Sequence, residues 1–104
     1  MLYFNLHPSV NDKYSLIRML KKDISTCYII SDNMEDNCIA SIYDDNILCG
    51  GALVFREDNP VYLFCFFEQA IYCTDLYQQQ LKRAIEMVLP KTELYDVYCI
   101  NATS

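Results

Sequence analysis

Few side chains in this sequence have the type and spacing that enzyme chemistry requires. The single histidine, His7, lacks a neighbouring acidic or cysteine motif, so we interpret it as a turn or surface residue. Glu68 follows an apolar segment that could raise the pKa of its carboxyl and make it a general base. Cys73 precedes a predicted helix whose dipole could lower the pKa of the thiol. We favour the structural interpretation of both residues, as a strand-end carboxylate in solvent and a structural thiol.

Glycine is scarce, and this argues against several kinds of cofactor site. The only two glycines are Gly50 and Gly51, side by side in a predicted strand. Loops that cradle phosphate or a nucleotide need glycine so that backbone N–H groups can approach the anion. No predicted helix begins at such a loop, and the cysteine spacings fit no zinc-binding pattern. We therefore expect no metal and no cofactor, and we favour a protein without enzymatic activity.

The charge balance favours a protein partner over nucleic acid or a membrane. The chain has 104 residues, a length typical of one domain spanning 1–104, with 14 acidic and 8 basic side chains and a net charge of −6. Direct binding of nucleic acid needs a basic surface, which this composition does not supply. An acidic surface instead complements a basic protein. The longest apolar run, Val61–Phe67, is much too short to span a membrane.

Cysteine is frequent in this chain, and its distribution favours reduced thiols. Most of the cysteines lie in apolar, strand-like segments, where a free cysteine behaves as a small hydrophobic residue. The first residues lack the basic and apolar regions of a signal peptide. We therefore predict buried thiols and a cytoplasmic location, with disulfides as the alternative. The six cysteines are Cys27, Cys38, Cys49, Cys65, Cys73 and Cys99.

Hydrophobic periodicity predicts the elements that must position these side chains. A first helix has an apolar stripe over Val10–Ile24 and a cap at Ser9 or Asn11, and a second helix covers Thr74–Leu89. A tight hairpin turn is predicted at Asp44–Asn46, because Asp and Asn tolerate the required backbone angles. The predicted strands are Leu2–Leu6, Thr26–Ser31, Cys38–Tyr43, Ile47–Arg56, Val61–Phe67 and Glu93–Ile100.

The order of these elements predicts an α+β fold. Three meandering strands are followed by a helix and a final strand, and a strand–helix–strand unit of this kind returns in parallel through a right-handed crossover. We expect a mixed, mainly antiparallel, twisted sheet of about five strands, with two helices packed against it.

This layout resembles the fold of the GCN5-related N-acetyltransferases (GNAT). Ile47–Phe55, with its glycine pair, looks like the third strand of that family, and Val61–Phe67 looks like the fourth. Thr74–Leu89 is similar to the helix that receives acetyl-CoA. The resemblance implies a GNAT-like, truncated half of the fold, in which acetyl-CoA would be the cofactor.

The expected acetyl-CoA loop departs from the family pattern. The family has an Arg/Gln-x-x-Gly-x-Gly/Ala loop before this helix, whereas Gln69 is the one matching position here. Both glycines are absent, and Ile71 and Tyr72 would crowd the phosphates. For a minimal GNAT-type acetyltransferase, the resemblance assigns Glu68 as the base and Gln69 and Thr74 to the cofactor.

Three hypotheses for function follow. The favoured one is a small acidic protein-binding module, an inhibitor that occludes a larger basic protein, similar in size and charge to phage anti-defence proteins (including anti-CRISPR proteins) and to toxin-immunity proteins. The alternatives are the minimal acetyltransferase and a homodimer formed through an open sheet edge at Tyr95–Ile100. The residues expected to bind a partner are Asp44, Asp45, Glu57, Asp58, Tyr95 and Tyr98.

Overall fold

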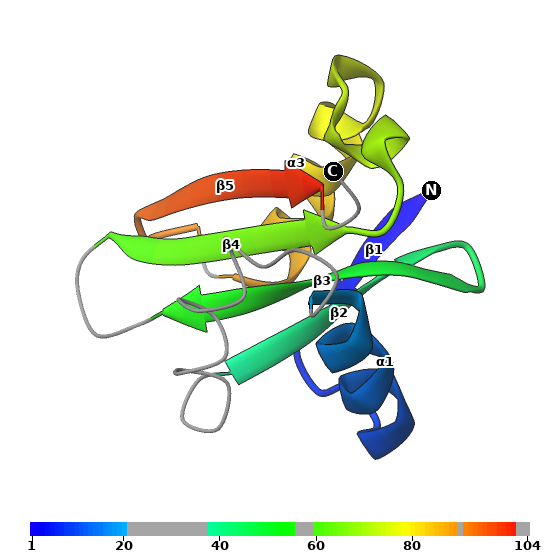
Figure 1. Ribbon diagram of the computed structural model, residues 1–104. Helices are drawn as coiled ribbons and strands as arrows, with labels where there is room; N and C mark the ends of the chain where they lie inside the picture. Colours follow the sequence, from blue (N-terminus) through cyan, green and yellow to red (C-terminus); the bar gives the residue numbers. More distant parts are fainter. Residues whose placement is uncertain (21–37, 56–59, 90, 102–104) are drawn as a thin grey trace.

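The structure, a computed structural model, contains one mixed five-stranded sheet that is flanked by helices (Figure 1). It describes residues 1–20, 38–55, 60–89 and 91–101. In chain order the elements are β1 (Leu2–Asn5), α1 (Val10–Leu20), β2 (Cys38–Asp44), β3 (Ile47–Phe55), β4 (Val61–Phe67), the 3-10 helix η1 (Ala70–Cys73), α3 (Asp75–Val88) and β5 (Tyr95–Asn101).

The strands lie in the sheet in the same order as in the sequence. Neighbours from β1 to β4 pair antiparallel, and β4 pairs in parallel with β5. The connection between β4 and β5 contains η1 and α3, because a parallel pair needs a long crossover. The predicted α+β fold with a mixed, mainly antiparallel sheet and two packed helices is confirmed. The strand predicted at Thr26–Ser31 lies outside the described residues.

The helices cover opposite faces of the sheet, so the core has two parts. One face packs α3 against apolar side chains such as Ala40, Leu63 and Phe67, and the other packs α1 against Leu53 and Phe66. Figure 1 shows α1 on the near side of the sheet and α3 behind it. Side chains that alternate along β2, β3 and β4 supply both parts, as expected for a sheet that is buried on both faces.

The glycine pair lets α1 and β4 approach the centre of the sheet closely. A Cβ atom at Gly51 would lie 2.7 Å from Leu16 Cδ2 on α1 and 2.8 Å from Phe66 Cζ on β4. A Cβ atom at Gly50 would collide with the backbone carbonyl oxygen of Phe66. The two glycines therefore serve packing in the middle of β3.

Local capping explains where the helices begin. The backbone N–H of Asp12 donates to Ser9 Oγ (3.2 Å), which confirms Ser9 as the cap of α1. Thr74 is the N-cap residue of α3, but its hydroxyl donates to the carbonyl oxygen of Ile71 (2.6 Å) rather than capping the helix. The hydroxyl of Thr74 is thus engaged by η1, an element that the periodicity does not predict.

Candidate functional site

The turn between β2 and β3 collects acidic and aromatic side chains at one end of the sheet. Asp45 has a positive φ of 54°, as predicted for this tight turn. We call this region the hairpin end and define it as Tyr3, Tyr43, Asp44, Asp45 and Ile47. Tyr3 lies opposite Tyr43 in the β1–β2 register, and their rings stack with centroids 5.8 Å apart.

The acidic groups of the hairpin end are held by specific partners. The α-ammonium group of Met1 lies 3.1 Å from a carboxylate oxygen of both Asp44 and Asp45. The Tyr72 hydroxyl donates to Asp44 Oδ2 (3.0 Å), and the Tyr3 hydroxyl donates to the backbone oxygen of Asp45. Asp44 is therefore surrounded by donors, and its side chain is only 23% exposed, whereas that of Asp45 is 80% exposed.

A second tyrosine–aspartate contact ties the hairpin end to α1. The Tyr43 hydroxyl donates to Asp12 Oδ2, and this bond, together with burial, raises the pKa of Tyr43 to about 12. Burial and the bond to Asp44 likewise raise the pKa of Tyr72 to about 12. These tyrosines stay neutral over the physiological pH range, so they act as fixed hydrogen-bond donors and cannot serve as acids or bases near neutral pH.

Of the predicted partner-binding residues, the four that the structure describes do not form one surface. Asp44 and Asp45 lie at the hairpin end, whereas Tyr95 and Tyr98 are on β5. Because successive strand residues point to opposite faces, Tyr95 packs with the α3 side of the core and Tyr98 stacks on Phe64 at 5.1 Å on the other face. Glu57 and Asp58 lie outside the described residues.

The candidates for acetyl transfer lie around η1. Glu68 is exposed, and with Arg18 and Leu48 it lines a shallow hollow beside α1. Gln69 precedes η1, and its backbone oxygen accepts the N–H of Tyr72 (3.3 Å). The N–H of Thr74 donates to the Ile71 oxygen (3.2 Å). The turn therefore uses internally two backbone donors that an anion cradle at this position would need.

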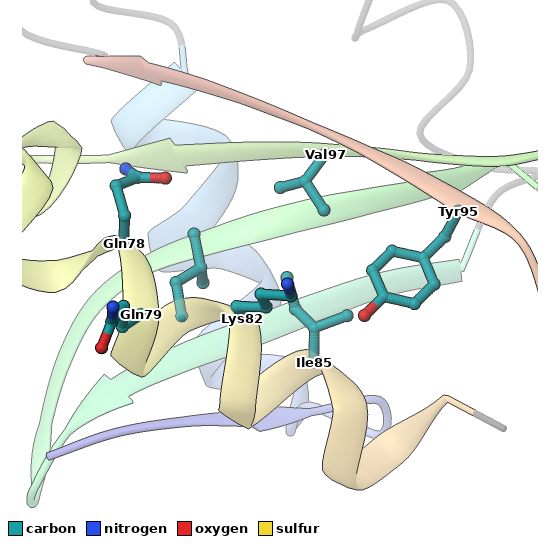
Figure 2. Close-up of a pocket in the computed structure, with 7 residues that line it drawn as sticks. Gln78, Gln79, Lys82, Ile85, Tyr95 and Val97 are labelled. Carbon is teal, nitrogen blue, oxygen red and sulfur yellow. The ribbon is translucent and has the colours of Figure 1, made fainter. Parts of the chain in front are cut away.

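A cavity of about 280 Å³ separates α3 from β5. Figure 2 shows Gln78, Lys82 and Ile85 extending from α3, with Val97 and Tyr95 on the facing strand. The amide nitrogen of Gln78 also lies 4.0 Å from Cys99 Sγ. The pattern of residues in the sequence does not predict this cavity, because the cavity depends on how far the helix lies from the strand.

Three thiols from three elements approach each other on the α3 side of the sheet. Cys65 lies directly opposite Cys99 in the parallel β4–β5 register, and Cys73 follows from η1. Burial, and then the nearby Cys99, raise the pKa of Cys73, so a helix-activated nucleophile is not favoured there. Cys49, Cys65, Cys73 and Cys99 are free thiols.

Neither His7 nor a cluster of metal-ligating side chains forms a further site in the described part of the chain. The side chain of His7 is exposed, and its backbone N–H donates to Asn5 Oδ1 (3.0 Å). Within residues 1–20, 38–55, 60–89 and 91–101, no group of three His, Cys, Asp or Glu side chains is placed to hold a metal ion. In the same part of the chain, no helix is both long enough and apolar enough to cross a membrane.

Comparison with known proteins gives no relative from which a function could be transferred. No family model matches the chain, and no curated protein or solved structure matches it. The resemblance to GCN5-related N-acetyltransferases therefore stays a prediction, and the candidate functional regions are the hairpin end, the turn around η1 and the thiols.

Proposed function

We propose that this protein is a non-enzymatic binding module that occludes a basic surface of a larger protein with its hairpin end. The observation that carries the proposal is the exposed surface at the turn. The Asp45 carboxylate is 80% exposed, Ile47 is 70% exposed and Tyr3 is 44% exposed. A carboxylate beside apolar and aromatic side chains combines charge complementarity with the apolar contact that protein interfaces use.

The hairpin end is also well ordered for recognition. Tyr43 is fixed by Asp12, Tyr72 by Asp44, and Tyr3 by the backbone of Asp45. Groups that are already held in position lose little conformational entropy when a partner binds. The net charge of −6 adds a long-range attraction for a basic partner, although Met1 partly balances the charge of Asp44 and Asp45.

An inhibitor is the biological role that fits this proposal. A chain of 104 residues with an acidic surface can block a basic groove by steric and electrostatic occlusion without chemistry of its own. Phage anti-defence proteins, including anti-CRISPR proteins, and toxin-immunity proteins act in this general way, and we place this chain with them as a cytoplasmic protein. A homodimer is compatible with this role, since β5 is the last strand of the described sheet.

The proposal is tested by affinity capture with three immobilised baits: the wild type, Asp45→Lys and Glu86→Lys. Glu86 is a matched control because it is an exposed acid on α3 beside Tyr95, at the opposite end of the sheet from the hairpin. We expect the wild type and Glu86→Lys baits to retain equal amounts of a basic protein. The Asp45→Lys bait should retain at least about tenfold less of the same protein. Equal retention by all three baits would remove the hairpin end from the interaction.

A second candidate, acetyl transfer from acetyl-CoA, is favoured by one observation. The connection from β4 through α3 to a parallel β5 is the arrangement that the resemblance to N-acetyltransferases implies. In that case Glu68 would be the base, and Gln69 and Thr74 would contact the cofactor. A saturable rise in melting temperature with acetyl-CoA, lost in Thr74→Pro but kept in the Asp45→Lys control, would support this candidate over the binding module.

A further inference from the structure

The pairing of β4 with β5 brings two cysteines together inside the sheet. Val61 to Phe67 pair with Tyr95 to Asn101 without a shift in register, so Cys65 and Cys99 are direct neighbours. Neighbouring strands are about 4.8 Å apart, which is inside the Cα–Cα range of about 4.4–6.8 Å that a disulfide spans. The strands already hold the two residues at a distance that an S–S bond can bridge.

The environments of the two thiols differ. Cys65 is fully buried between the sheet and α3, whereas Cys99 is half-buried. Hydrogen bonds from the Cys65 thiol and, to a smaller extent, from the amide of Gln78 lower the pKa of Cys99 to about 7 against the opposing effect of burial. The bond between the two thiols and burial raise the pKa of Cys65. Cys99 is thus the thiol of this pair that becomes a thiolate near neutral pH, and the thiolate is the nucleophile.

The cavity between α3 and β5 lies close to Cys99. Cys99 is not one of its lining residues, but Gln78 is, and the amide nitrogen of Gln78 lies 4.0 Å from Cys99 Sγ. Lys82 extends into the same space from α3 (Figure 2). Its ammonium group would attract an anionic ligand, and the apolar side chains of Ile85 and Val97 form part of the wall.

We propose that Cys99 and Cys65 form a redox-active dithiol that a small disulfide oxidises through the α3–β5 cavity, with Cys99 as the attacking residue and Cys65 as the resolving residue. This inference is independent of the proposed binding function, because the thiols lie on β4 and β5 and not at the hairpin end. Cys65 is assigned as the resolving thiol because it is the register partner of Cys99, whereas Cys73 comes from η1.

The exchange has two steps. The Cys99 thiolate attacks one sulfur of a small disulfide RSSR, the S–S bond of the reagent breaks, and RS⁻ leaves, so that Cys99 carries a mixed disulfide. Cys65 then attacks Cys99 Sγ, a second RS⁻ leaves, and the proton of Cys65 passes to it. The two protein thiols lose two electrons and two protons in total, and RSSR is reduced to two RSH.

The test uses oxidised glutathione as the small disulfide, with intact-mass and peptide-mapping mass spectrometry of the reduced full chain. We expect the wild type to lose two hydrogen atoms and to contain a Cys65–Cys99 bridge. Cys65→Ala should stop with one glutathionyl group on Cys99, whereas Cys73→Ser, the matched control, should form the same bridge as the wild type. A bridge that joins Cys73 to either partner would overturn the proposal.

The pH dependence of the wild-type reaction provides a test that needs no variant. If Cys99 attacks, the rate at which oxidised glutathione is consumed should reach half of its maximum near pH 7. A rate that instead rises through about pH 8.5, as for an ordinary thiol, would contradict the role of Cys99.

Discussion

The hairpin end and the Cys65–Cys99 pair belong to one sheet, but a hydrogen bond raises a pKa in the first region and lowers a pKa in the second. At the hairpin end, Tyr43 donates to the Asp12 carboxylate, and its pKa rises to about 12. Between β4 and β5, the Cys99 sulfur accepts a bond from Cys65, and its pKa falls to about 7. A titratable group that donates to an anion has a raised pKa and stays neutral. A titratable group that accepts a hydrogen bond has a lowered pKa and ionises more easily.

This difference separates recognition from reactivity in the molecule. The hairpin end combines an exposed surface with Tyr43, whose raised pKa keeps its hydroxyl protonated near neutral pH, and this suits stable binding. The thiol pair packs with α3 in the core, and the cavity between α3 and β5 lies beside Gln78, which contacts Cys99; this arrangement suits reaction with a small molecule. Each of the following variants is chosen to alter one region or to compare the two.

The largest effect is expected from Gly50→Ala, which lies between the two regions. The added Cβ would collide with the backbone oxygen of Phe66 and approach Phe67 Cδ1 at 2.7 Å, so β4 must move away from β3. We expect a loss of about 2–3 kcal/mol in the free energy of unfolding, measured by urea denaturation. An unchanged midpoint would show that the two strands are not held as closely as described.

Tyr43→Phe should weaken the hairpin end alone. The substitution removes the hydroxyl that donates to Asp12 and leaves a partly buried carboxylate without this donor. We expect a loss of about 1 kcal/mol in unfolding free energy, with the reaction of Cys99 with oxidised glutathione unchanged. Tyr14→Phe, at an exposed tyrosine on α1, is the control and should have little effect. Equal losses in both variants would argue against the Asp12 contact.

Stability should respond to pH with opposite signs in the two regions. The folded-state pKa of Tyr43, about 12, lies above its reference value of 10.0. Its contribution to the free energy of unfolding is therefore complete below pH 10 and is lost toward pH 12. The pKa of Cys99, about 7, lies below 9.0, so its contribution is complete above pH 9 and is lost as the pH falls through 7.

Urea denaturation of the reduced protein checks these signs. The stability difference between the wild type and Tyr43→Phe should shrink from pH 10 to 12. The difference between the wild type and Cys99→Ala should grow from pH 7 to 9. If both differences in unfolding free energy changed with pH in the same direction, the two hydrogen bonds would not have opposite effects.

The smallest effect is expected at the turn itself. Because Asp45 has a φ of 54°, Asp45→Ala and Asp45→Gly remove the same carboxylate but differ in backbone strain. We expect Asp45→Gly to be more stable than Asp45→Ala by about 0.5 kcal/mol, because the strain of Ala at this φ is partly offset by the greater unfolded-state entropy of Gly, while both bind a captured partner equally weakly. Different affinities for the two variants would indicate that turn conformation, rather than charge, controls binding.

Most of the fold was predictable because each element has a strong local signal. The apolar segment Val61–Phe67 and the acidic turn at Asp44–Asn46 mark β4 and the β2–β3 hairpin, and both are confirmed. Periodicity did not predict η1, because a single 3-10 turn has no repeating apolar pattern. This turn matters for function, since it engages Thr74 and the backbone donors near it.

Less of the candidate site was predictable, because it depends on contacts between distant residues. Asp44 and Asp45 were identified from a cluster of acids, but their tyrosine partners come from β1 and η1. The pairing of Cys65 with Cys99 depends on the register of a parallel strand pair, which sequence spacing does not specify. Tyr95 and Tyr98 were grouped by proximity in the sequence, although a separation of three residues places them on opposite faces of β5.

The binding surface is tested most directly by ¹⁵N–¹H correlation spectra of the labelled protein during titration with the partner that the wild type and Glu86→Lys baits recover. The account predicts that the largest changes occur at the amides of Asp45, Asn46 and Ile47, with little change along β5. Changes that are largest over Tyr95–Asn101 and absent at the turn would contradict it, and would place binding at the sheet edge.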